Sequence, residues 1–413
     1  MKPMNILIVS QYFWPESFII NDLAQSLAQE GHKITVITGK PNYPIGDIAA
    51  GYTQAGTQRE TFAGNVEVIR VPLRPRGKGG AVGLSLNYLS FVISGFLHFP
   101  RLLRGRSFDS VLFFGVSPLT AAIPAALMAW LKKAHLALWV QDLWPESLSA
   151  TGFVANRSVL WLVGLMMRAI YSRADTLLLQ SEAFVKPVST YADPRKMIYF
   201  PNPAPVNDDK AYELPPSLES NFHDCFPIVF AGNLGKAQSL ETIVDAARHL
   251  RDQPKIRFVI VGTGSEVDHL RQLIEDNRLD NVHLTGLVDR SLMPSLFRRA
   301  GALLVTLKHD PALGMVVPSK IQAYMQAGKP IIGALNGEGA RIIEAAGCGL
   351  AVAAGDGAGL AKSILTLYSM PDNRRETMGL EGRRYFEAHF EAGSAARKLI
   401  QIFETRMGAR QRD

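Results

Sequence analysis

Two glycine-containing segments in the second half of the chain have the residue types of phosphate-binding turns. Each follows a short apolar run and precedes a helical pattern, and the candidate residues are Gly232, Asn233, Gly235, Lys236, Gly262 and Gly264. Glycines between a strand and a helix allow backbone N–H groups to approach phosphate oxygens. Lys236 would place a positive charge against a diphosphate, unless it is an ordinary solvated surface lysine. Gly262-Thr263-Gly264 lacks a third glycine and lies in the second strand–helix unit of its half, so by itself it does not predict a dinucleotide site.

A third candidate anion site lies in residues 314–350. Pro318 interrupts the chain, Ser319 is a good N-cap residue, and the apolar positions of residues 320–327 have helical spacing. A short strand follows at 331–333, and a tight loop that contains Glu338 precedes a second helix at 340–346. Helix N-termini offer free N–H groups and a positive dipole end to an anion. The alternative is that this stretch is ordinary α/β scaffold.

Polar and aromatic residues follow the predicted strands of the first half. The loops at 11–16, 39–44 and 141–147 supply Trp14, Glu16, Asn42, Tyr43, Gln141, Asp142 and Glu146. In open α/β sheets, ligands bind at the carboxyl ends of the strands. Two carboxylates beside Trp144 therefore indicate a ligand pocket, although Pro145-Glu146 is also a normal start for a helix.

The elements that position these residues are alternating strands and helices. Apolar runs predict strands at 6–10, 34–38, 66–71, 110–115, 137–140, 176–180 and 197–200, and again at 227–231, 257–261, 282–284 and 302–306. A chain of 413 residues is too long for one compact core. The sequence therefore predicts an α/β protein with two Rossmann-like, doubly wound domains facing across a cleft. We expect an N-terminal domain at 1–203, a linker at 204–226, a C-terminal domain at 227–390 and a final segment at 391–413.

The composition is that of a globular chain whose net positive charge is concentrated in one segment. Apolar residues make up 47% and charged residues 20%, which excludes a disordered chain. Two cysteines form neither a disulfide framework nor a metal-site spacing, which favours a reducing compartment, and the N-terminus lacks a signal-peptide pattern. Residues 68–108 contain seven basic residues and no acid, while the remaining 37 basic residues equal the 37 acidic ones. The seven are Arg70, Arg74, Arg76, Lys78, Arg101, Arg104 and Arg106.

The middle of this basic segment, residues 79–100, is uncharged and rich in Leu, Phe, Val and Ile. Asn87, Ser90, Ser94 and His98 lie at helical spacing on one face. An apolar helix flanked by arginines fits an interfacial membrane helix better than a nucleic-acid surface. The length also permits a transmembrane span, but four polar side chains on one face argue against a helix surrounded by lipid. The alternative is a buried helix with basic loops.

The order of the motifs along the chain resembles the GT-B glycosyltransferases, and among them the retaining, nucleotide-sugar-using family that includes many bacterial polysaccharide transferases. The resemblance is carried by residues 39–44 (Gly-Lys-Pro-Asn-Tyr-Pro), 141–146 (Gln-Asp-Leu-Trp-Pro-Glu), 200–202 (Phe-Pro-Asn), 232–236 (Gly-Asn-Leu-Gly-Lys), 261–264 (Val-Gly-Thr-Gly), 318–320 (Pro-Ser-Lys) and 327–330 (Ala-Gly-Lys-Pro). Within this family the sequence is most similar to the N-acetyl-L-fucosamine transferases of O-antigen and capsule gene clusters.

The resemblance implies a UDP-sugar donor in the C-terminal domain and a lipid-diphosphate-linked sugar acceptor in the N-terminal domain, with a final helix at about 394–407 packing back on the first domain. It adds Asn202 to the candidate substrate-binding residues, together with Ser319, Lys320 and Glu338. We expect Asp142 to orient or deprotonate the acceptor hydroxyl, and Lys236 with helix N-termini to stabilise the UDP leaving group. We also expect a cytoplasmic enzyme that is peripheral on the inner face of the bacterial plasma membrane. It would bind anionic lipid through residues 68–108 and would bind no nucleic acid.

The sequence departs from the family at two places. Many relatives carry two glutamates in the stretch that matches 314–326, whereas this chain has no acid there and has Gln322 and Ala323 near the expected second glutamate. Glu338 is our candidate for the missing sugar and ribose contacts. Relatives often have Gly-Gly in the first loop, where residues 14–17 of this chain are Trp-Pro-Glu-Ser. The chain also lacks a D-x-D pattern, which predicts a reaction without a metal ion or other cofactor.

Two other functions fit parts of the pattern. A nucleotide-sugar epimerase has a similar architecture but would not need the basic apolar segment. A non-enzymatic membrane scaffold of polysaccharide assembly would keep that segment, while its glycine turns would bind nothing. UDP release that requires the acceptor favours the transferase over the epimerase, and thermal stabilisation by UDP counts against the scaffold.

Overall fold

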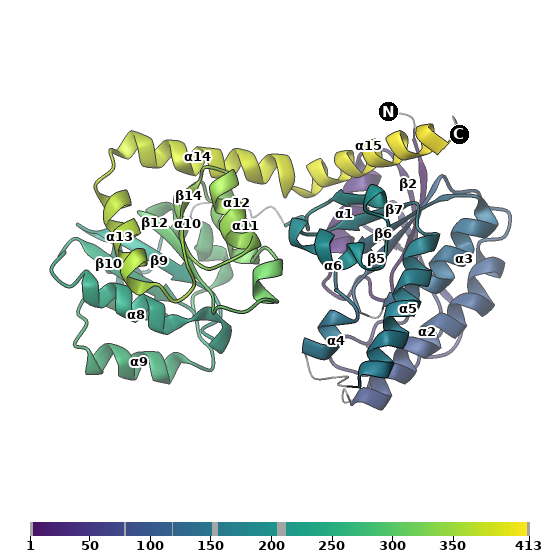
Figure 1. The fold of residues 1–413 in the computed structure, drawn as a ribbon, viewed down its shortest axis with the longest axis horizontal. Coiled ribbons are helices and arrows are strands. Elements are labelled where there is room, and N and C mark those ends of the chain that lie inside the picture. Colours follow the sequence, from purple (N-terminus) through teal and green to yellow (C-terminus); the bar gives the residue numbers. More distant parts are fainter. Residues whose placement is uncertain (1–2, 78–79, 118, 151–155, 205–211, 411–413) are drawn as a thin grey trace. The chain divides into compact units, whose positions relative to one another are not determined.

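The computed structural model describes residues 3–77, 80–117, 119–150, 156–204 and 212–410, and two compact units divide the chain. Residues 1–203 with 392–413 form the first unit, and residues 204–391 form the second. Each unit is built on a mainly parallel sheet flanked by helices (Figure 1). The predicted fold class, α/β with two doubly wound domains, is therefore confirmed.

The first unit contains an eight-stranded sheet. Its strands are β1 (Asn5–Val9), β2 (Lys33–Thr38), β3 (Gln58–Phe62), β4 (Val66–Arg70), β5 (Ser110–Gly115), β6 (His135–Val140), β7 (Thr176–Leu179) and β8 (Met197–Tyr199). They lie in the order β3-β4-β2-β1-β5-β6-β7-β8, and all pairs are parallel except β3 with β4. Most strands are continuous apolar runs because both faces of the sheet are covered. The sequence did not predict β3, whose residues Gln-Arg-Glu-Thr-Phe are typical of a charged edge strand.

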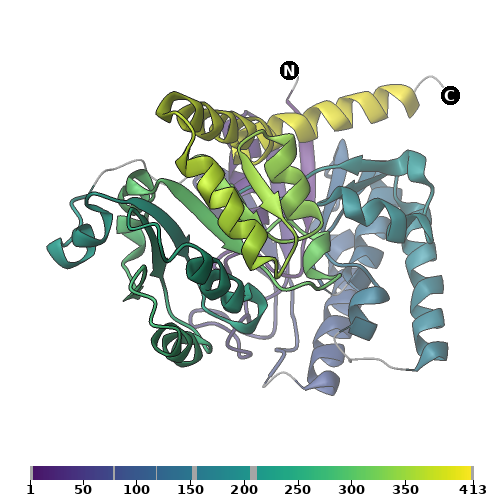
Figure 2. The ribbon, with the colours of Figure 1, turned by 60° about the vertical axis from the view of Figure 1, so that its left-hand side comes forward.

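Helices cover the two faces of this sheet in two sets. The connection from β1 to β2 crosses the sheet in one direction, and those from β4 to β5, β5 to β6 and β6 to β7 cross it in the other. Because such crossovers are right-handed, α1 (Ile19–Gln29) lies on one face, while α2 (Ala81–Leu102), α3 (Ala122–Lys132) and α5 (Arg157–Arg173) lie on the opposite face (Figures 1 and 2). The short helices α4 (Glu146–Ala150) and α6 (Val185–Ser189) complete this set of connections.

The last helix of the chain, α15 (Ala392–Arg410), belongs to the first unit. It packs beside α1, and Phe403 of α15 shares a core with Leu23 of α1 and with Ile6 and Ile8 of β1. The apolar stripe of α15 therefore extends the core on the α1 face of the sheet.

The second unit contains a six-stranded, entirely parallel sheet in the order β11-β10-β9-β12-β13-β14. The strands are β9 (Phe226–Ala231), β10 (Ile256–Val261), β11 (Val282–Gly286), β12 (Ala302–Thr306), β13 (Ile331–Ala334) and β14 (Gly349–Val352). The helices are α7 (Pro216–Glu219), α8 (Leu240–His249), α9 (Val267–Asp276), α10 (Met293–Arg299), α11 (Ser319–Gln326), α12 (Glu338–Ala345), α13 (Gly357–Tyr368) and α14 (Asp372–His389). The winding direction reverses between β9 and β12, and in the first unit between β1 and β5. Such switch points form ligand sites at the carboxyl ends of the strands.

Part of the predicted linker belongs to the second unit. Leu214 and Leu218 are buried in the same core as Val229 of β9 and Leu303 of β12. The prediction that residues 204–226 only connect two domains is therefore wrong for this part, because its prolines and acids surround two buried leucines. Residues 205–211 of the predicted linker lie outside the described residues.

Candidate functional site

The two glycine turns of the second unit pack directly against each other. Gly232 and Gly262 have φ angles of 137° and 136°, and a Cβ on Gly262 would lie 1.9 Å from the carbonyl oxygen of Gly232. A Cβ on Gly264 would lie 2.4 Å from the carbonyl oxygen of Leu234. The N–H of Gly232 donates to Val261 at 2.9 Å, and the N–H of Gly262 donates to the last residue of β11 at 2.8 Å. The interpretation that these two N–H groups face a phosphate is therefore wrong, and the glycines allow one turn to contact the other.

Lys320, the second residue of α11, reaches the first of these turns. A Cβ on Gly232 would lie 2.7 Å from Cε of Lys320, so the glycine leaves space for the lysine side chain. Nζ of Lys320 lies 3.6 Å from the ring centre of Phe230 and donates to Oε1 of Gln238 at 2.5 Å. Burial lowers the pKa of the Lys320 ammonium to about 7. A titratable cation thus lies beside the β9 turn, at the switch point of the second sheet.

Three other residues that were predicted to bind the UDP-sugar donor lie at the surface of the second unit. Asn233 and Lys236 are exposed in the turn after β9, and Gly235 between them is buried. Ser319 is also exposed, but it is the first residue of α11 and not its N-cap. The N-cap is Pro318, whose φ of −61° and ψ of 132° give the extended backbone that this position requires. The prediction of Ser319 as the capping residue is wrong.

Glu338, the candidate for sugar and ribose contacts, is occupied by a local partner. Its side chain is 3% exposed at the start of α12, and its two carboxylate oxygens accept hydrogen bonds from Arg341 at 2.6 and 3.0 Å. The preceding Gly337 has a φ of 74°, and a Cβ there would lie 2.1 Å from the carbonyl oxygen of Gly314. Glu338 therefore stabilises the first turn of α12, and its contact with a sugar stays a prediction.

In the first unit, Glu16 joins the loops that follow β1 and β2. Its Oε1 accepts from the backbone N–H groups of Asn42 at 2.8 Å and Tyr43 at 2.7 Å, and its Oε2 accepts from the N–H of Phe13 at 3.2 Å. Burial raises the pKa of the Glu16 carboxyl, and the three hydrogen bonds partly oppose that shift. The buried carboxylate positions the two loops, and a contact of Glu16 with a substrate stays a prediction.

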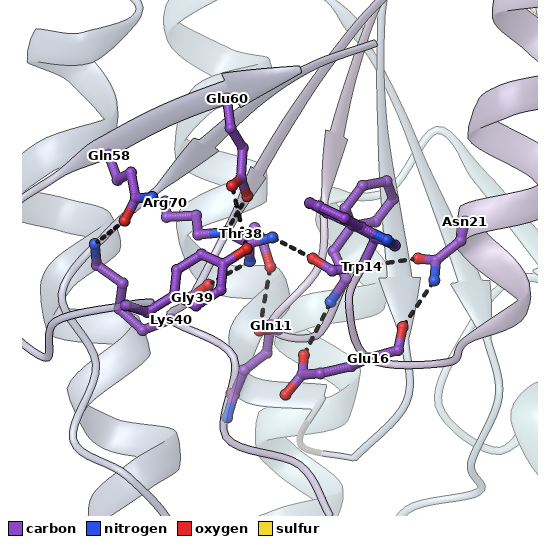
Figure 3. A network of polar contacts seen from close by, with 12 residues as sticks. Gln11, Trp14, Glu16, Asn21, Thr38, Gly39, Lys40, Gln58, Glu60 and Arg70 are labelled. Atoms are coloured by element: carbon purple, nitrogen blue, oxygen red, sulfur yellow. Dashed lines mark hydrogen bonds and ion pairs between the residues drawn. The ribbon is translucent and has the colours of Figure 1, made fainter. Parts of the chain in front are cut away.

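A buried network of charged side chains supports the same loops (Figure 3). Arg70, the last residue of β4, pairs with Glu60 of β3 and donates to the backbone carbonyls of both loops, including that of Trp14. Lys40 is 1% exposed and donates to Oε1 of Gln58 at 3.3 Å. Burial lowers the pKa of the Lys40 ammonium, and the nearby Arg70 lowers it further. Edge strand β3 thus supplies the carboxylate and the amide that hold both cations in place.

Aromatic rings gather at the same edge of the first sheet. Tyr12 stacks on Phe18 with 5.3 Å between ring centres, and the ring of Tyr43 lies 5.8 Å from Tyr12 and 5.4 Å from Phe18. The guanidinium of Arg76 covers Tyr43 at 5.0 Å, and both Tyr43 and Trp14 keep an exposed face. Exposed aromatic faces with few polar groups between them are typical of organic ligand sites. Trp14 and Tyr43 therefore remain candidates for contact with an acceptor.

Asp142 lies in the loop after β6, where one of its carboxylate oxygens is held. Oδ2 accepts from the N–H of Ser117 at 2.9 Å and from its hydroxyl at 2.7 Å, and Nε1 of Trp144 donates to the same hydroxyl at 3.1 Å. Within the described ranges of the chain, no group donates to Oδ1. Burial raises the pKa of the Tyr88 hydroxyl on α2, and the nearby charge of Asp142 adds to this effect. The carboxylate is oriented through one oxygen and presents the other.

An amide network joins the loops at the ends of β6, β7 and β8. Asn202 exchanges hydrogen bonds of 2.8 and 2.9 Å with Gln141 and donates to Gln180 at 2.7 Å. Glu146 begins α4 and accepts a hydrogen bond of 3.5 Å from the hydroxyl of Tyr191. The structure thus brings Gln141 and Asn202 together, as one site requires, although both amides are engaged with protein groups.

Helix α2 turns its polar face inward. The side chain of Asn87 is buried, accepts from Gln11 at 2.7 Å and donates to the carbonyl oxygen of Arg74 at 2.6 Å. Ser94 and the rings of Phe91 and Phe99 are also buried, whereas a second set of apolar side chains of α2 is exposed. Among the described residues, Val82–Leu102 is one helix whose length and mean hydropathy of 1.4 would suffice to cross a membrane. Its polar contacts make it part of the helix layer of the first unit.

The seven basic residues of segment 68–108 do not form one exposed cluster. Arg70 is buried with Glu60, and Arg106 forms two hydrogen bonds with Glu67, at 2.5 and 2.9 Å. Glu60 and Glu67 precede residue 68 in the sequence, so a count of acidic residues within 68–108 does not include them. Arg74, Arg101 and Arg104 are exposed, and Arg76 is half-buried against Tyr43. Lys78 lies outside the described residues.

Sequence reasoning missed several residues of these sites. Ser117 follows the correctly predicted strand at 110–115. The rule that ligands bind at the carboxyl ends of strands would have selected its loop as well. Asn87 was predicted as part of a polar helix face but not as a partner of the loops after β1 and β2. Arg70 carried no local signal, because its partners come from β3 and from a loop 56 residues away.

Comparison with known proteins assigns a glycosyltransferase domain to each unit. Residues 18–203 match the family model described as a glycosyl transferase 4-like domain, and residues 226–370 match the model described as glycosyl transferases group 1. The putative colanic acid biosynthesis glycosyl transferase WcaI of Escherichia coli (strain K12) is 27% identical over 340 residues, which cover 79% of this chain and 82% of that protein.

Solved structures share the architecture over nearly the whole chain. Sucrose-phosphate synthase from Thermosynechococcus elongatus has a TM-score of 0.67 and 16% identity, with 98% of this chain and 100% of that chain covered. Anabaena HepE in complex with UDP has a TM-score of 0.65 and 15% identity, with 97% and 100% covered. At these identities the likeness shows the fold, which is GT-B.

Proposed function

Because residues 226–370 match the glycosyl transferases group 1 model and the chain has the GT-B fold, we propose that it transfers a sugar from a UDP-sugar to a lipid-diphosphate-linked acceptor, with retention of configuration. The product would be an O-antigen or capsule polysaccharide, and N-acetyl-L-fucosamine is our candidate for the transferred sugar. Two comparisons support this proposal. HepE, of the same fold, has been solved with UDP and with UDP-glucose, and WcaI is described as a putative colanic acid biosynthesis glycosyl transferase.

The observation that carries the proposal is the arrangement at the switch point of the second sheet. Two cations and a helix N-terminus lie at the carboxyl edge of this sheet: Lys320, the exposed Lys236 and the start of α11. The glycines of the two adjacent turns leave the space in which these turns and Lys320 pack together. A UDP leaving group develops negative charge as the sugar departs. Two cations and a helix N-terminus would stabilise that charge without a metal ion.

The first unit would supply the acceptor side of the reaction. The bond between the sugar C1 and the diphosphate oxygen breaks, and a bond between C1 and the acceptor oxygen forms on the same face of the sugar. Asp142 would accept a hydrogen bond from the acceptor hydroxyl through Oδ1 and take its proton, because Oδ2 is held by Ser117. Trp14 and Tyr43 would contact the acceptor through their exposed faces.

We further propose that the protein is cytoplasmic and bound to the inner face of the plasma membrane, where lipid-diphosphate acceptors are presented. The exposed Arg74, Arg101 and Arg104 support the contact of segment 68–108 with anionic lipid. Each basic residue near such a surface contributes about 1 kcal/mol at physiological salt.

A screen of UDP-sugars with and without a synthetic lipid-diphosphate sugar tests the function. We expect UDP release from one donor only when the acceptor is present, and a product with the donor's anomeric configuration by NMR. Asp142→Asn should lower the turnover at least 100-fold, while the matched control Asp193→Asn, on an exposed turn of the same unit, should leave it unchanged. Conversion of the UDP-sugar to an epimer without acceptor, or an inverted product, would contradict the proposal.

A further inference from the structure

The three helices on one face of the first sheet share an unusual charge pattern. None of the residues of α2, α3 and α5 is Asp or Glu, although the average content of the chain predicts about four or five acids in this length. Five residues of the same helices are basic. These are Arg101, Lys132, Arg157, Arg168 and Arg173. A surface made by these helices therefore favours an anionic partner.

The outer face of α2 is an apolar stripe. Val82, Leu89, Ile93, Phe96 and Leu97 are all exposed. Because a helix turns about 100° per residue, these five positions fall within an arc of about 100°. The buried side of α2 carries Asn87 and Ser94 together with the rings of Phe91 and Phe99, so the exposed stripe is a second apolar surface that the core of the unit does not cover.

Helix α5 carries a second apolar stripe. Trp161 is 64% exposed, Leu162 57% and Leu165 42%. Arg157 and Arg168 flank this stripe along one side of the helix, by the same helical geometry. Lys, Arg and Trp around apolar residues are typical of helices that lie in a membrane interface.

Helix α3 lies between these two helices and joins them into one layer. A Cβ on Gly95 of α2 would lie 2.6 Å from Cβ of Pro124 of α3, so the two helices pack closely, and α3 also contacts α5. Figures 1 and 2 show α2, α3 and α5 side by side in both views. The C-terminal end of α3 adds Trp130, which is 74% exposed, and Leu131.

Positive charge borders this layer at the amino edge of the sheet. Arg101 lies in the last turn of α2 and Arg104 follows that helix, Lys133 follows α3, and Arg173 ends α5. All four are exposed. The nearby acids Asp109 and Asp175 each accept a backbone N–H, from Asn5 at 2.7 Å and Leu136 at 2.8 Å. The four cations outnumber these two acids, so positive charge is in excess at this edge.

We propose that the outer faces of α2, α3 and α5 together form a docking surface for an anionic lipid bilayer, with Trp161 and Leu162 of α5 and Trp130 of α3 entering the interface beside the α2 stripe. This inference builds on the proposed lipid-linked acceptor, but it extends the contact beyond segment 68–108 to two further helices. Segment 68–108 by itself would bind through its exposed arginines and the single stripe of α2. Three adjoining helices would hold the unit flat on the bilayer through apolar side chains as well.

Flotation of the full chain with vesicles tests the surface. We expect binding to vesicles of phosphatidylglycerol and phosphatidylethanolamine, and at least fivefold weaker binding of the double variant Leu162→Glu, Leu165→Glu. The matched control is Leu380→Glu on α14 of the second unit, a helical leucine that is 54% exposed, which should change binding less than twofold. Unchanged melting temperature and UDP affinity would show that the double variant is folded. Wild-type binding by this variant would overturn the proposal.

Tryptophan fluorescence gives an independent readout. Lipids brominated on the acyl chain should quench the wild-type chain, and Trp161→Phe or Trp130→Phe should remove part of that quenching. No quenching at saturating vesicles would overturn the insertion of these side chains. A wild-type dimer at micromolar concentration that the double glutamate variant dissociates would assign the surface to a second copy instead. Vesicle binding needs no sugar, so its loss and a failed UDP-release assay are separate results.

Discussion

Replacement of Lys320 should separate its role from that of an ordinary surface cation. In Lys320→Met, the loss of a charge-assisted contact with the diphosphate should weaken UDP binding by about 1.5–3 kcal/mol, or about 10- to 150-fold in Kd. The structure adds a second signature, because burial lowers the pKa of this ammonium to about 7 in the free protein. A bound diphosphate would hold the lysine in its charged form.

The sign of the pH dependence follows from these two states. Below pH 7 the free lysine is already charged, and above pH 7 it must take up a proton when UDP binds. For a pKa of about 7, the uptake is about 0.1 proton at pH 6 and about 0.9 at pH 8. The terminal phosphate of UDP, with a pKa near 6, is already ionised at pH 8 and does not obscure this uptake. The Kd for UDP should therefore rise about tenfold between pH 8 and 9.

Isothermal titration calorimetry in two buffers of different ionisation enthalpy measures this uptake directly. Lys320→Met should abolish it, and Lys320→Arg should bind without uptake because arginine stays charged. Lys329→Met is the matched control, because Lys329 is a second lysine of the same unit whose pKa is lowered by burial, and it lies away from the β9 turn. Equal heats for the wild type in both buffers at pH 8, or normal UDP affinity of Lys320→Met, would refute the reasoning.

Five further predictions concern other parts of the molecule. Lys236→Ala should lower UDP affinity by about 1.5–3 kcal/mol without changing the proton uptake, and unchanged binding by calorimetry would remove this residue from the site. EDTA should leave the turnover intact, and a loss that magnesium restores would show that the reaction needs a metal ion. Gly262→Ala should destabilise the second unit by about 2–4 kcal/mol, because the new Cβ meets a backbone oxygen at 1.9 Å, and thermal unfolding measures this. Glu16→Gln should raise the KM for the acceptor more than it lowers kcat, because the loop of Asn42 and Tyr43 loses the carboxylate that holds it. Arg101→Gln with Arg104→Gln should weaken binding to anionic vesicles at low salt. Binding equal to that of the wild type would show that neither arginine contacts the lipid.

The class of the fold and the order of its elements could be predicted from the amino-acid sequence. Strands buried on both faces are continuous apolar runs, and their lengths and the glycines after them are local features. The strands at 110–115 and 302–306 were predicted to the residue, and the carboxyl-end rule selected the loop of Asp142. Edge strand β3 was not predicted, because a strand with few buried residues has no continuous apolar run.

Which charged and polar groups are available for chemistry depends on contacts that form in the folded chain. Arg106, Arg70 and Glu338 are residue types that often bind ligands, yet each forms an ion pair with another side chain of the protein. The partners of both arginines come from β3 or β4, and the polar face of α2 meets loops more than 40 residues away. Hydrogen bonds and ion pairs act over a few ångströms in space, so composition and spacing along the chain do not encode them. The same reason explains Gly232 and Gly262, whose role depends on a neighbouring turn about 30 residues away and not on the local pattern that they share.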